Sequence, residues 1–238
     1  MNKKSLLILG VVLSAALLLR IYRIADIPPG LNRDEASLGY TAYSLLRTGR
    51  DEHGVFLPLS LKSFGDWKLP LYAYISIPAV SMFGLTEVAV RFPSVIAGIM
   101  TIVLTYLITK QLFKNEGIAH VSAGLLAFSP WHIFFSRVAS EANLAVFLIS
   151  LGFWLFLWKK NRWYVPVAFV LWVLTLLTYH GNHVFTILFA LGILIFFRNV
   201  FDTTSGRLSI GVFTLVAGII FSLTLFSADK TKISGLLS

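Results

Sequence analysis

The stretch VAVRFPSVIAGIMTIVLTYLITKQLF, residues 88–113, decides the class of fold. It exceeds the ~20 apolar residues that an α-helix needs to cross ~30 Å of hydrocarbon, and only Arg91 and Lys110 interrupt it with charge. Further apolar runs lie at 5–24, 118–135, 142–158, 163–180, 184–197 and 208–227. The pattern predicts an all-α, polytopic membrane protein with about seven transmembrane helices.

The composition supports this class. Of the 238 residues, 57% are hydrophobic and 13% are charged, whereas soluble domains carry ~25% charged residues. The net charge of +9 would suggest a nucleic-acid partner in a soluble protein. Here the basic residues lie between apolar runs, so membrane topology explains them and membrane lipid, not nucleic acid, is the expected partner. The chain has no cysteine and therefore no disulfide.

An additional apolar run, 69–86, decides the orientation. If it does not span, nine basic residues face the cytoplasm: Lys3, Lys4, Lys110, Lys114, Lys159, Lys160, Arg162, Arg198 and Arg207. Three face outward in short loops: Arg137, Lys230 and Lys232. This asymmetry follows the positive-inside rule, so we expect 69–86, with Pro70 and Pro78, to be an interfacial or re-entrant helix.

The resulting prediction is a single membrane domain over 1–238, in a cell membrane, with a cytoplasmic N-terminus. Span 1 covers 5–24, an outer loop with interfacial helices covers 25–87, spans 2–7 lie within 88–227, and 228–238 forms an outer tail. Most acidic residues fall in or beside the outer loop: Asp26, Asp34, Glu35, Asp51, Glu52, Asp66 and Glu87. Transporters place ionisable residues within spans, so this distribution favours an enzyme working at the outer leaflet.

Residues 32–49 predict a helix in that loop. Leu38, Ala42 and Leu45 follow helical spacing, and Gly49 can end the helix. Two interpretations of Asp34 and Glu35 remain open. They can serve the helix start, with Asn32 as the cap and Glu35 closing a capping box. Alternatively, they form a carboxylate pair in which one member accepts a proton from an acceptor hydroxyl.

Several segments resemble one family of membrane enzymes. They are DEASLGY (34–40), TGRDEHG (48–54), FGDWKLPLY (64–72), FG (83–84), RFPS (91–94), SPWHIFFSR (129–137), EAN (141–143) and YH (179–180). In this order they are similar to the polyprenyl-phosphate-sugar-dependent glycosyltransferases of GT-C type, which include protein O-mannosyltransferases and the aminoarabinose transferase of lipid A. The resemblance covers about residues 20–185.

The resemblance implies an inverting transfer from a polyprenyl-phosphate-linked sugar to an acceptor hydroxyl at the outer face. It implies Asp34 as general base, with Glu35 beside it. Members of the family usually carry more spans after the matched region. The chain is therefore expected to be the N-terminal portion of such an enzyme, and a second chain could supply the rest.

Five further residues are candidates for substrate binding, each with a structural alternative. Lys68 could pair with the lipid phosphate, or extend to the interface as an ordinary lysine. Asp66 could hold a sugar or a metal, or be a solvated loop acid. Arg91 could contact phosphate, or simply end a span. Arg137 and Glu141 could both contact the substrate, with Glu141 facing the sugar, or they could form an i,i+4 helix pair with each other.

His180 and His183 lie three residues apart near the outer end of a predicted span. His180 is a further candidate for substrate binding. No acid lies beside the two histidines, so they indicate a metal site only weakly. A divalent metal is a conceivable cofactor, but the sequence names no ligand set. Trp67 and Tyr72 could line a sugar site, although aromatic residues at span ends are typical of the membrane interface.

Two other function classes stay open. The chain could be a non-catalytic, truncated or split membrane module that needs a second chain. It could also be a lipid-binding or transport protein. The sequence does not specify the sugar or the acceptor.

Overall fold

The computed structural model describes residues 2–63, 66–158, 164–197 and 206–219. The elements in chain order are α1 (Lys3–Ile21), α2 (Arg33–Thr48), β1 (Leu61–Ser63), β2 (Asp66–Lys68), α3 (Leu71–Phe83), α4 (Glu87–Phe113), α5 (Glu116–Ala127), α6 (Pro130–Arg137), α7 (Glu141–Trp158), α8 (Tyr164–Thr175) and α9 (Asn182–Phe196). A further helix covers Gly206–Ile219. The predicted all-α class is confirmed, with strand structure confined among the described residues to the small β1–β2 hairpin and an isolated bridge between Arg50 and Phe56.

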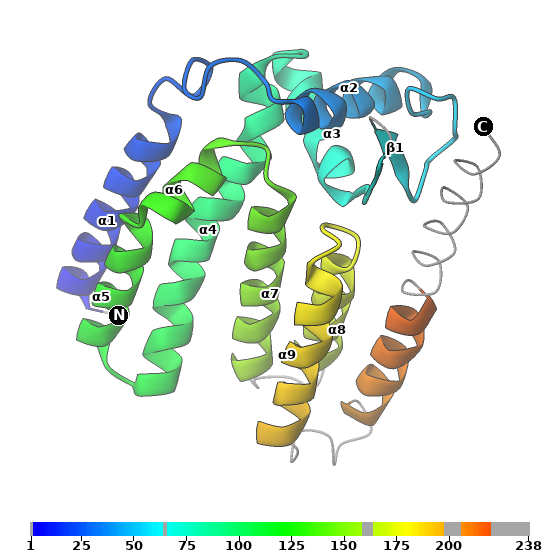
Figure 1. Ribbon diagram of the computed structural model, residues 1–238. Coiled ribbons are helices and arrows are strands. Elements are labelled where there is room, and N and C mark those ends of the chain that lie inside the picture. Colours follow the sequence, from blue (N-terminus) through cyan, green and yellow to red (C-terminus); the bar gives the residue numbers. More distant parts are fainter. Residues whose placement is uncertain (1, 64–65, 159–163, 198–205, 220–238) are drawn as a thin grey trace.

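The long helices form an up-and-down bundle (Figure 1). Hydrogen bonds between the Ser5 hydroxyl and the side chains of Tyr106 (2.9 Å) and His120 (3.3 Å) join the start of α1 to the second half of α4 and the start of α5. Arg137, at the end of α6, donates to the carbonyl oxygen of Leu19 in the last turn of α1. These contacts place Lys3 and Lys4 at the same end as the α4–α5 turn, opposite α2 and α3.

Among the described residues, the helices α1, α4 and α7 are long and apolar enough to cross a membrane. The run 118–135 is instead split into α5 and α6, which are bent by 58° and would give a fourth span if counted together. Pro130 causes the break because it lacks the N–H that would continue α5. Arg20 donates to the carbonyl oxygen of Ala127 at this break (3.2 Å).

Helices α8, α9 and Gly206–Ile219 match the remaining apolar runs but are shorter than a full span. The count of seven spans therefore stays a prediction. Residues 220–227 of the last predicted span, and the predicted tail 228–238, lie outside the described residues.

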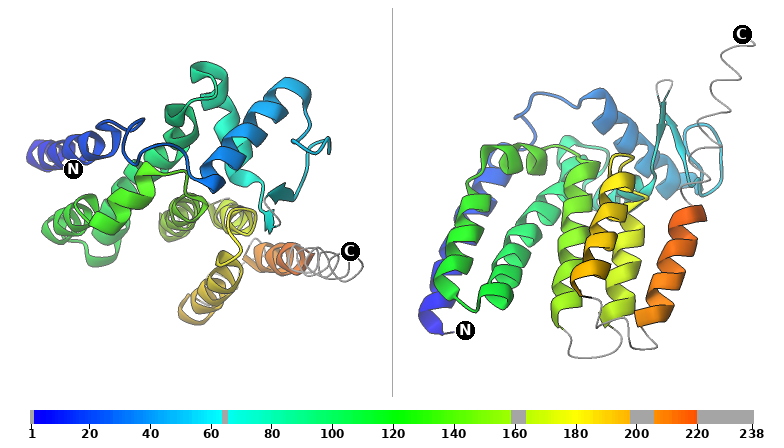
Figure 2. Two further views of the ribbon diagram at one scale, coloured as in Figure 1. Left: turned by 45° about the horizontal axis from the view of Figure 1, so that its top comes forward. Right: turned by 60° about the horizontal axis from the view of Figure 1, so that its bottom comes forward.

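The segment after α1 forms a layer across one end of the bundle. Figure 2 shows α2 and α3 lying across the upper ends of the long helices, with the hairpin beside them. Leu38, Leu61, Tyr72, Val90 and Leu144 form one buried cluster that joins this layer to α4 and α7. Gly39 permits the close approach, because a Cβ there would lie 2.5 Å from Val90. The layer is thus fixed on the bundle by a continuous apolar core.

Candidate functional site

The start of α2 has the predicted capping arrangement. The Asn32 side chain accepts a hydrogen bond from the backbone N–H of Glu35 (2.9 Å), and the Glu35 carboxylate accepts one from the N–H of Asn32 (3.1 Å). At the other end, Gly49 adopts a left-handed conformation, with φ of 68°, that suits glycine. The capping interpretation of Asn32, Glu35 and Gly49 is confirmed.

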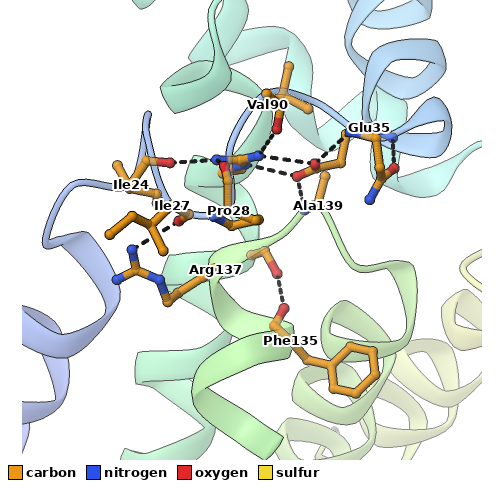
Figure 3. A network of polar contacts seen from close by, with 12 residues as sticks. Ile24, Ile27, Pro28, Glu35, Val90, Phe135, Arg137 and Ala139 are labelled. Atoms are coloured by element: carbon orange, nitrogen blue, oxygen red, sulfur yellow. Dashed lines mark hydrogen bonds and ion pairs between the residues drawn. The ribbon is translucent and has the colours of Figure 1, made fainter. Parts of the chain in front are cut away.

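Glu35 is also the centre of a buried ion pair, shown in Figure 3. Its side chain is 1% exposed and its Oε1 lies 2.9 Å from Nε of Arg91, whose side chain is fully buried. Oε1 also accepts a hydrogen bond from the backbone N–H of Ala139 (2.9 Å). Glu35 therefore joins α2, α4 and the α6–α7 turn, and its carboxylate is engaged within the protein.

Arg91 extends this network to the segment between α1 and α2. Its Nη1 donates to the carbonyl oxygens of Ile24 (2.6 Å) and Pro28 (3.0 Å), and its Nη2 donates to that of Gly30. Nη2 also donates to Oε2 of Glu35 (3.2 Å), so together with the bond from Nε each of the five guanidinium N–H groups has an acceptor within the chain. The predicted contact of Arg91 with a donor phosphate stays a prediction, and in this conformation the guanidinium is occupied by these bonds.

Arg137 holds the same segment from the other side. It donates to the carbonyl oxygens of four residues: Leu19 (2.6 Å), Arg20 (3.3 Å), Tyr22 (2.6 Å) and Ile27 (2.9 Å). Helix α6 ends at Arg137, so Arg137 and Glu141 are not on one helix, and the i,i+4 alternative for them is wrong. Glu141 is the first residue of α7 and is partly buried.

Asp34 lies in a different environment from its neighbour. Its side chain is 72% exposed, and its Oδ1 lies 2.7 Å from Nζ of Lys68, whose side chain is 11% exposed. The structure thus brings together two residues that the sequence placed 34 positions apart. The exposed carboxylate can accept a proton, and the largely buried ammonium beside it can hold an anion, so both functions meet at one place on the α2–α3 layer.

Lys68 is carried by the hairpin, in which Leu61 pairs with Lys68, Lys62 with Trp67 and Ser63 with Asp66. Asp66 begins β2. The carbonyl oxygen of Trp67 accepts a hydrogen bond from Nε2 of His180 (2.8 Å), in the α8–α9 connection. His180 therefore lies beside the hairpin, a contact that no pattern in the sequence indicates.

The sequence left a divalent metal open as a cofactor, which raises the question of which side chains could bind one. Within the ranges that the structure describes, no three or more His, Cys, Asp or Glu side chains are grouped to hold an ion. Nε2 of His183 is hydrogen-bonded to the carbonyl oxygen of Leu176 (2.9 Å), as that of His180 is to Trp67. A metal cofactor therefore stays a prediction without named ligands.

Sequence reasoning missed the polar network under α2. The signal available was Arg91 itself, a charged residue inside an apolar run, which must find partners when buried. The sequence could not name Glu35 or the backbone carbonyls of 24–30 as those partners. Neither could it predict the contact between Lys68 and Asp34, because both depend on how the loop folds over the bundle.

Comparison with known proteins gives consistent matches. A family model described as dolichyl-phosphate-mannose-protein mannosyltransferase matches residues 68–227. The dolichyl-phosphooligosaccharide-protein glycotransferase 2 of Archaeoglobus fulgidus is 39% identical over 95 residues, which are 38% of this chain and 16% of the relative.

Solved structures agree at the level of fold. The apo oligosaccharyltransferase of Archaeoglobus fulgidus superimposes with a TM-score of 0.65 at 17% identity, over 91% of this chain and 29% of that chain. AglB of the same organism, in complex with an inhibitory peptide and a dolichol-phosphate, also gives 0.65, at 16% identity, over 92% and 29%. This chain thus spans less than a third of the length of these relatives. The family match covers most of the chain, so it belongs to the dolichyl-phosphate-mannose-protein mannosyltransferase family of GT-C type membrane glycosyltransferases.

Proposed function

We propose that this chain transfers a sugar from a polyprenyl-phosphate donor to an acceptor hydroxyl at the outer face of the membrane. Family membership supports the class of reaction and the lipid-linked donor. The observation that best supports the site is the ion pair between the exposed Asp34 and the largely buried Lys68, whose Oδ1 and Nζ atoms lie 2.7 Å apart on the α2–α3 layer. One structural relative, AglB, was solved in complex with a dolichol-phosphate, which supports a lipid-phosphate-linked donor for this chain as well.

The proposed step is a single displacement with inversion. The acceptor oxygen forms a bond to the anomeric carbon while the bond from that carbon to the phosphate oxygen breaks. Asp34 accepts the hydroxyl proton, and the polyprenyl phosphate leaves with the bonding electron pair. Lys68 holds the phosphate as its charge develops, because its ammonium is the basic group next to Asp34.

Glu35, Arg91 and Arg137 serve this site indirectly. Their bonds hold the α1–α2 segment and the first turn of α2, and so keep Asp34 at a fixed place. Asp66 and Glu141 remain proposed sugar contacts, because the first lies two residues before Lys68 and the second begins α7 beyond the turn that binds Glu35.

The orientation belongs to the same proposal, with the N-terminus in the cytoplasm and the α2–α3 layer outside. It is supported by the start of α1, which carries Lys3 and Lys4, and the end of α4, which carries Lys110 and Lys114. Both lie at the end of the bundle opposite the layer (Figure 1). Because the chain lacks cysteine, single cysteines report cleanly. We expect Leu59→Cys, which is 71% exposed in the wild type, to react with an impermeant maleimide in sealed cells, and Lys4→Cys to react only after lysis. Equal labelling in sealed cells would contradict this orientation.

Transfer itself is tested with membranes that contain the full chain. Radiolabelled polyprenyl-phosphate mannose is supplied with a serine- and threonine-rich peptide, and peptide-bound label is followed over time. We expect label on the peptide with the wild type and with Asp26→Asn, and its loss with Asp34→Asn. Asp26 is the matched control because it is also an exposed aspartate in an ion pair, with Arg23. Absence of transfer by the wild type would favour the non-catalytic module that needs a second chain.

A further inference from the structure

The β1–β2 hairpin is held at both outer edges by histidines. Lys62 and Trp67 form the central residue pair of the hairpin. The carbonyl oxygen of Lys62 is hydrogen-bonded to Nε2 of His53 (3.1 Å), and the carbonyl oxygen of Trp67 is hydrogen-bonded to Nε2 of His180 (2.8 Å). A two-stranded hairpin is marginally stable by itself, so such contacts decide where it lies. His53 belongs to the same outer loop as the hairpin. His180 comes from the helical bundle, 113 residues after Trp67.

A second bond ties the same two segments. The backbone N–H of Leu71 donates to the carbonyl oxygen of Leu177 (3.1 Å), also in the α8–α9 connection. The backbones of Trp67 and Leu71, on either side of Lys68, are therefore both hydrogen-bonded to the α8–α9 connection. These two contacts fix the backbone of Lys68 to the bundle. They are four residues apart in the hairpin segment and three apart in the α8–α9 connection.

The α8–α9 connection is built to hold a fixed shape. The Thr178 hydroxyl donates to the carbonyl oxygen of Thr175 (2.6 Å) and accepts from the Asn182 side chain (3.2 Å). Nε2 of His183 is bonded to the carbonyl oxygen of Leu176 (2.9 Å), and the side chains of Thr175 and Thr178 are fully buried. A connection whose own polar groups are paired in this way is a firm support for the residue it presents.

We propose that His180 is a positioning residue, which sets the place of Lys68 relative to Asp34 through the carbonyl oxygen of Trp67. The inference rests on the proposed function for the roles of Lys68 and Asp34. It replaces direct substrate contact as the role of His180. The structural basis is the pair of bonds that brackets Lys68 and the ion pair that Lys68 makes.

The chemistry of the contact defines the variants. A carbonyl oxygen only accepts, so Nε2 of His180 carries the proton in this contact. In His180→Gln the side-chain amide nitrogen can donate from a similar distance, whereas His180→Ala has no donor. Tyr179→Phe is the matched control because it alters the adjacent side chain in the same connection and leaves the imidazole in place.

The experiment measures structure and transfer on the full chain. Hydrogen–deuterium exchange of the peptide containing residues 66–71 reports the hairpin, and the KM for polyprenyl-phosphate mannose reports donor use. For His180→Ala we expect exchange and donor KM to rise about 3- to 10-fold, the loss typical of one neutral hydrogen bond, with kcat changed less. His180→Gln should restore both values, and Tyr179→Phe should match the wild type.

A double variant shows whether the effect passes through Lys68. If it does, adding His180→Ala to Lys68→Ala changes the donor KM by less than about twofold, because contacts that act as a unit are not additive. Full additivity, or unchanged exchange in His180→Ala, would overturn the positioning role. If exchange rises in His180→Ala but Lys68→Ala leaves the donor KM unchanged, the positioning contact stands and the phosphate role of Lys68 in the proposed function fails.

Discussion

Two acidic residues that are neighbours in the chain lie in opposite environments. Asp34 is 72% exposed and pairs with Lys68, whereas Glu35 is 1% exposed and pairs with a fully buried Arg91. One step along a helix turns a side chain by about 100°, so the first turn of α2 presents one carboxylate to solvent and directs the next into the protein. One carboxylate can therefore anchor the helix while its neighbour stays accessible to solvent.

The two ion pairs differ in energy for the same reason. Solvent reaches the Asp34 side of the Asp34–Lys68 pair and screens it, so we expect a contribution to stability close to the ~0–1 kcal/mol of exposed pairs. Breaking a buried pair leaves an uncompensated charge in the interior, which is far more costly. Variants of the Glu35–Arg91 pair should therefore lower the free energy of unfolding, and variants of the Asp34–Lys68 pair should lower the rate of transfer.

The largest effect on stability is expected for Glu35→Gln. This variant keeps the size of the side chain but leaves the Arg91 charge without its counter-ion, and should lower the free energy of unfolding by roughly 3–5 kcal/mol. Thermal unfolding in detergent measures the change. Glu52→Gln is the control, because Glu52 is an acid of the same loop whose side chain is not buried. A Glu35→Gln protein that melts with the wild type would remove Glu35 as the anchor.

A smaller effect, on donor use, is expected for Lys68→Ala. Loss of a charge-assisted contact in a partly sheltered site should weaken donor binding by about 1.5–3 kcal/mol, or roughly 10- to 150-fold in donor KM. The unfolding midpoint should change little. Lys62→Ala, on the neighbouring strand, is the control for loss of a lysine from the hairpin. Equal donor KM values for Lys68→Ala and the wild type would take Lys68 out of the donor site.

The smallest effect is expected for Asn32→Ala. The variant removes the acceptor for the backbone N–H of Glu35 but leaves the bonds of the Glu35 carboxylate to Arg91 in place. Loss of an N-cap typically costs ~1 kcal/mol of stability. Asn32→Ser can accept the same bond and should recover most of it. Destabilisation as large as that of Glu35→Gln would mean that the cap, rather than the ion pair, holds the start of α2.

Much of the fold was predictable because hydrophobic length and charge carry the signal. The apolar runs 5–24, 88–113 and 142–158 became α1, α4 and α7, and the capped helix after Asn32 became α2. The run 118–135 was predicted as one helix, although Pro130 bends it at the α5–α6 break. Composition alone did not reveal this bend, because both halves are apolar.

The site was predictable only in part. Asp34 and Lys68 were each candidates, but their contact depends on a hairpin that packs beside α2, and no local pattern encodes that packing. Glu35 was grouped with Asp34 as a carboxylate pair, since the sequence shows two adjacent acids and not their opposite burial. Arg137 and His180 were candidates for substrate binding, and that role stays a prediction. The structure adds that both bind backbone carbonyl oxygens of distant segments, which no local pattern encodes.

We propose that Asp34 serves catalysis while Glu35 serves the fold, and one paired measurement tests this division of roles. Initial transfer rate and unfolding midpoint are determined on the same preparations of wild type, Asp34→Asn and Glu35→Gln. Loss of a general base typically lowers the rate ~10²–10⁴-fold, so Asp34→Asn should lose transfer at this scale and unfold with the wild type. Glu35→Gln should unfold earlier and, at a temperature where it is still folded, keep more activity than Asp34→Asn. An Asp34→Asn protein with near wild-type rate would contradict the account.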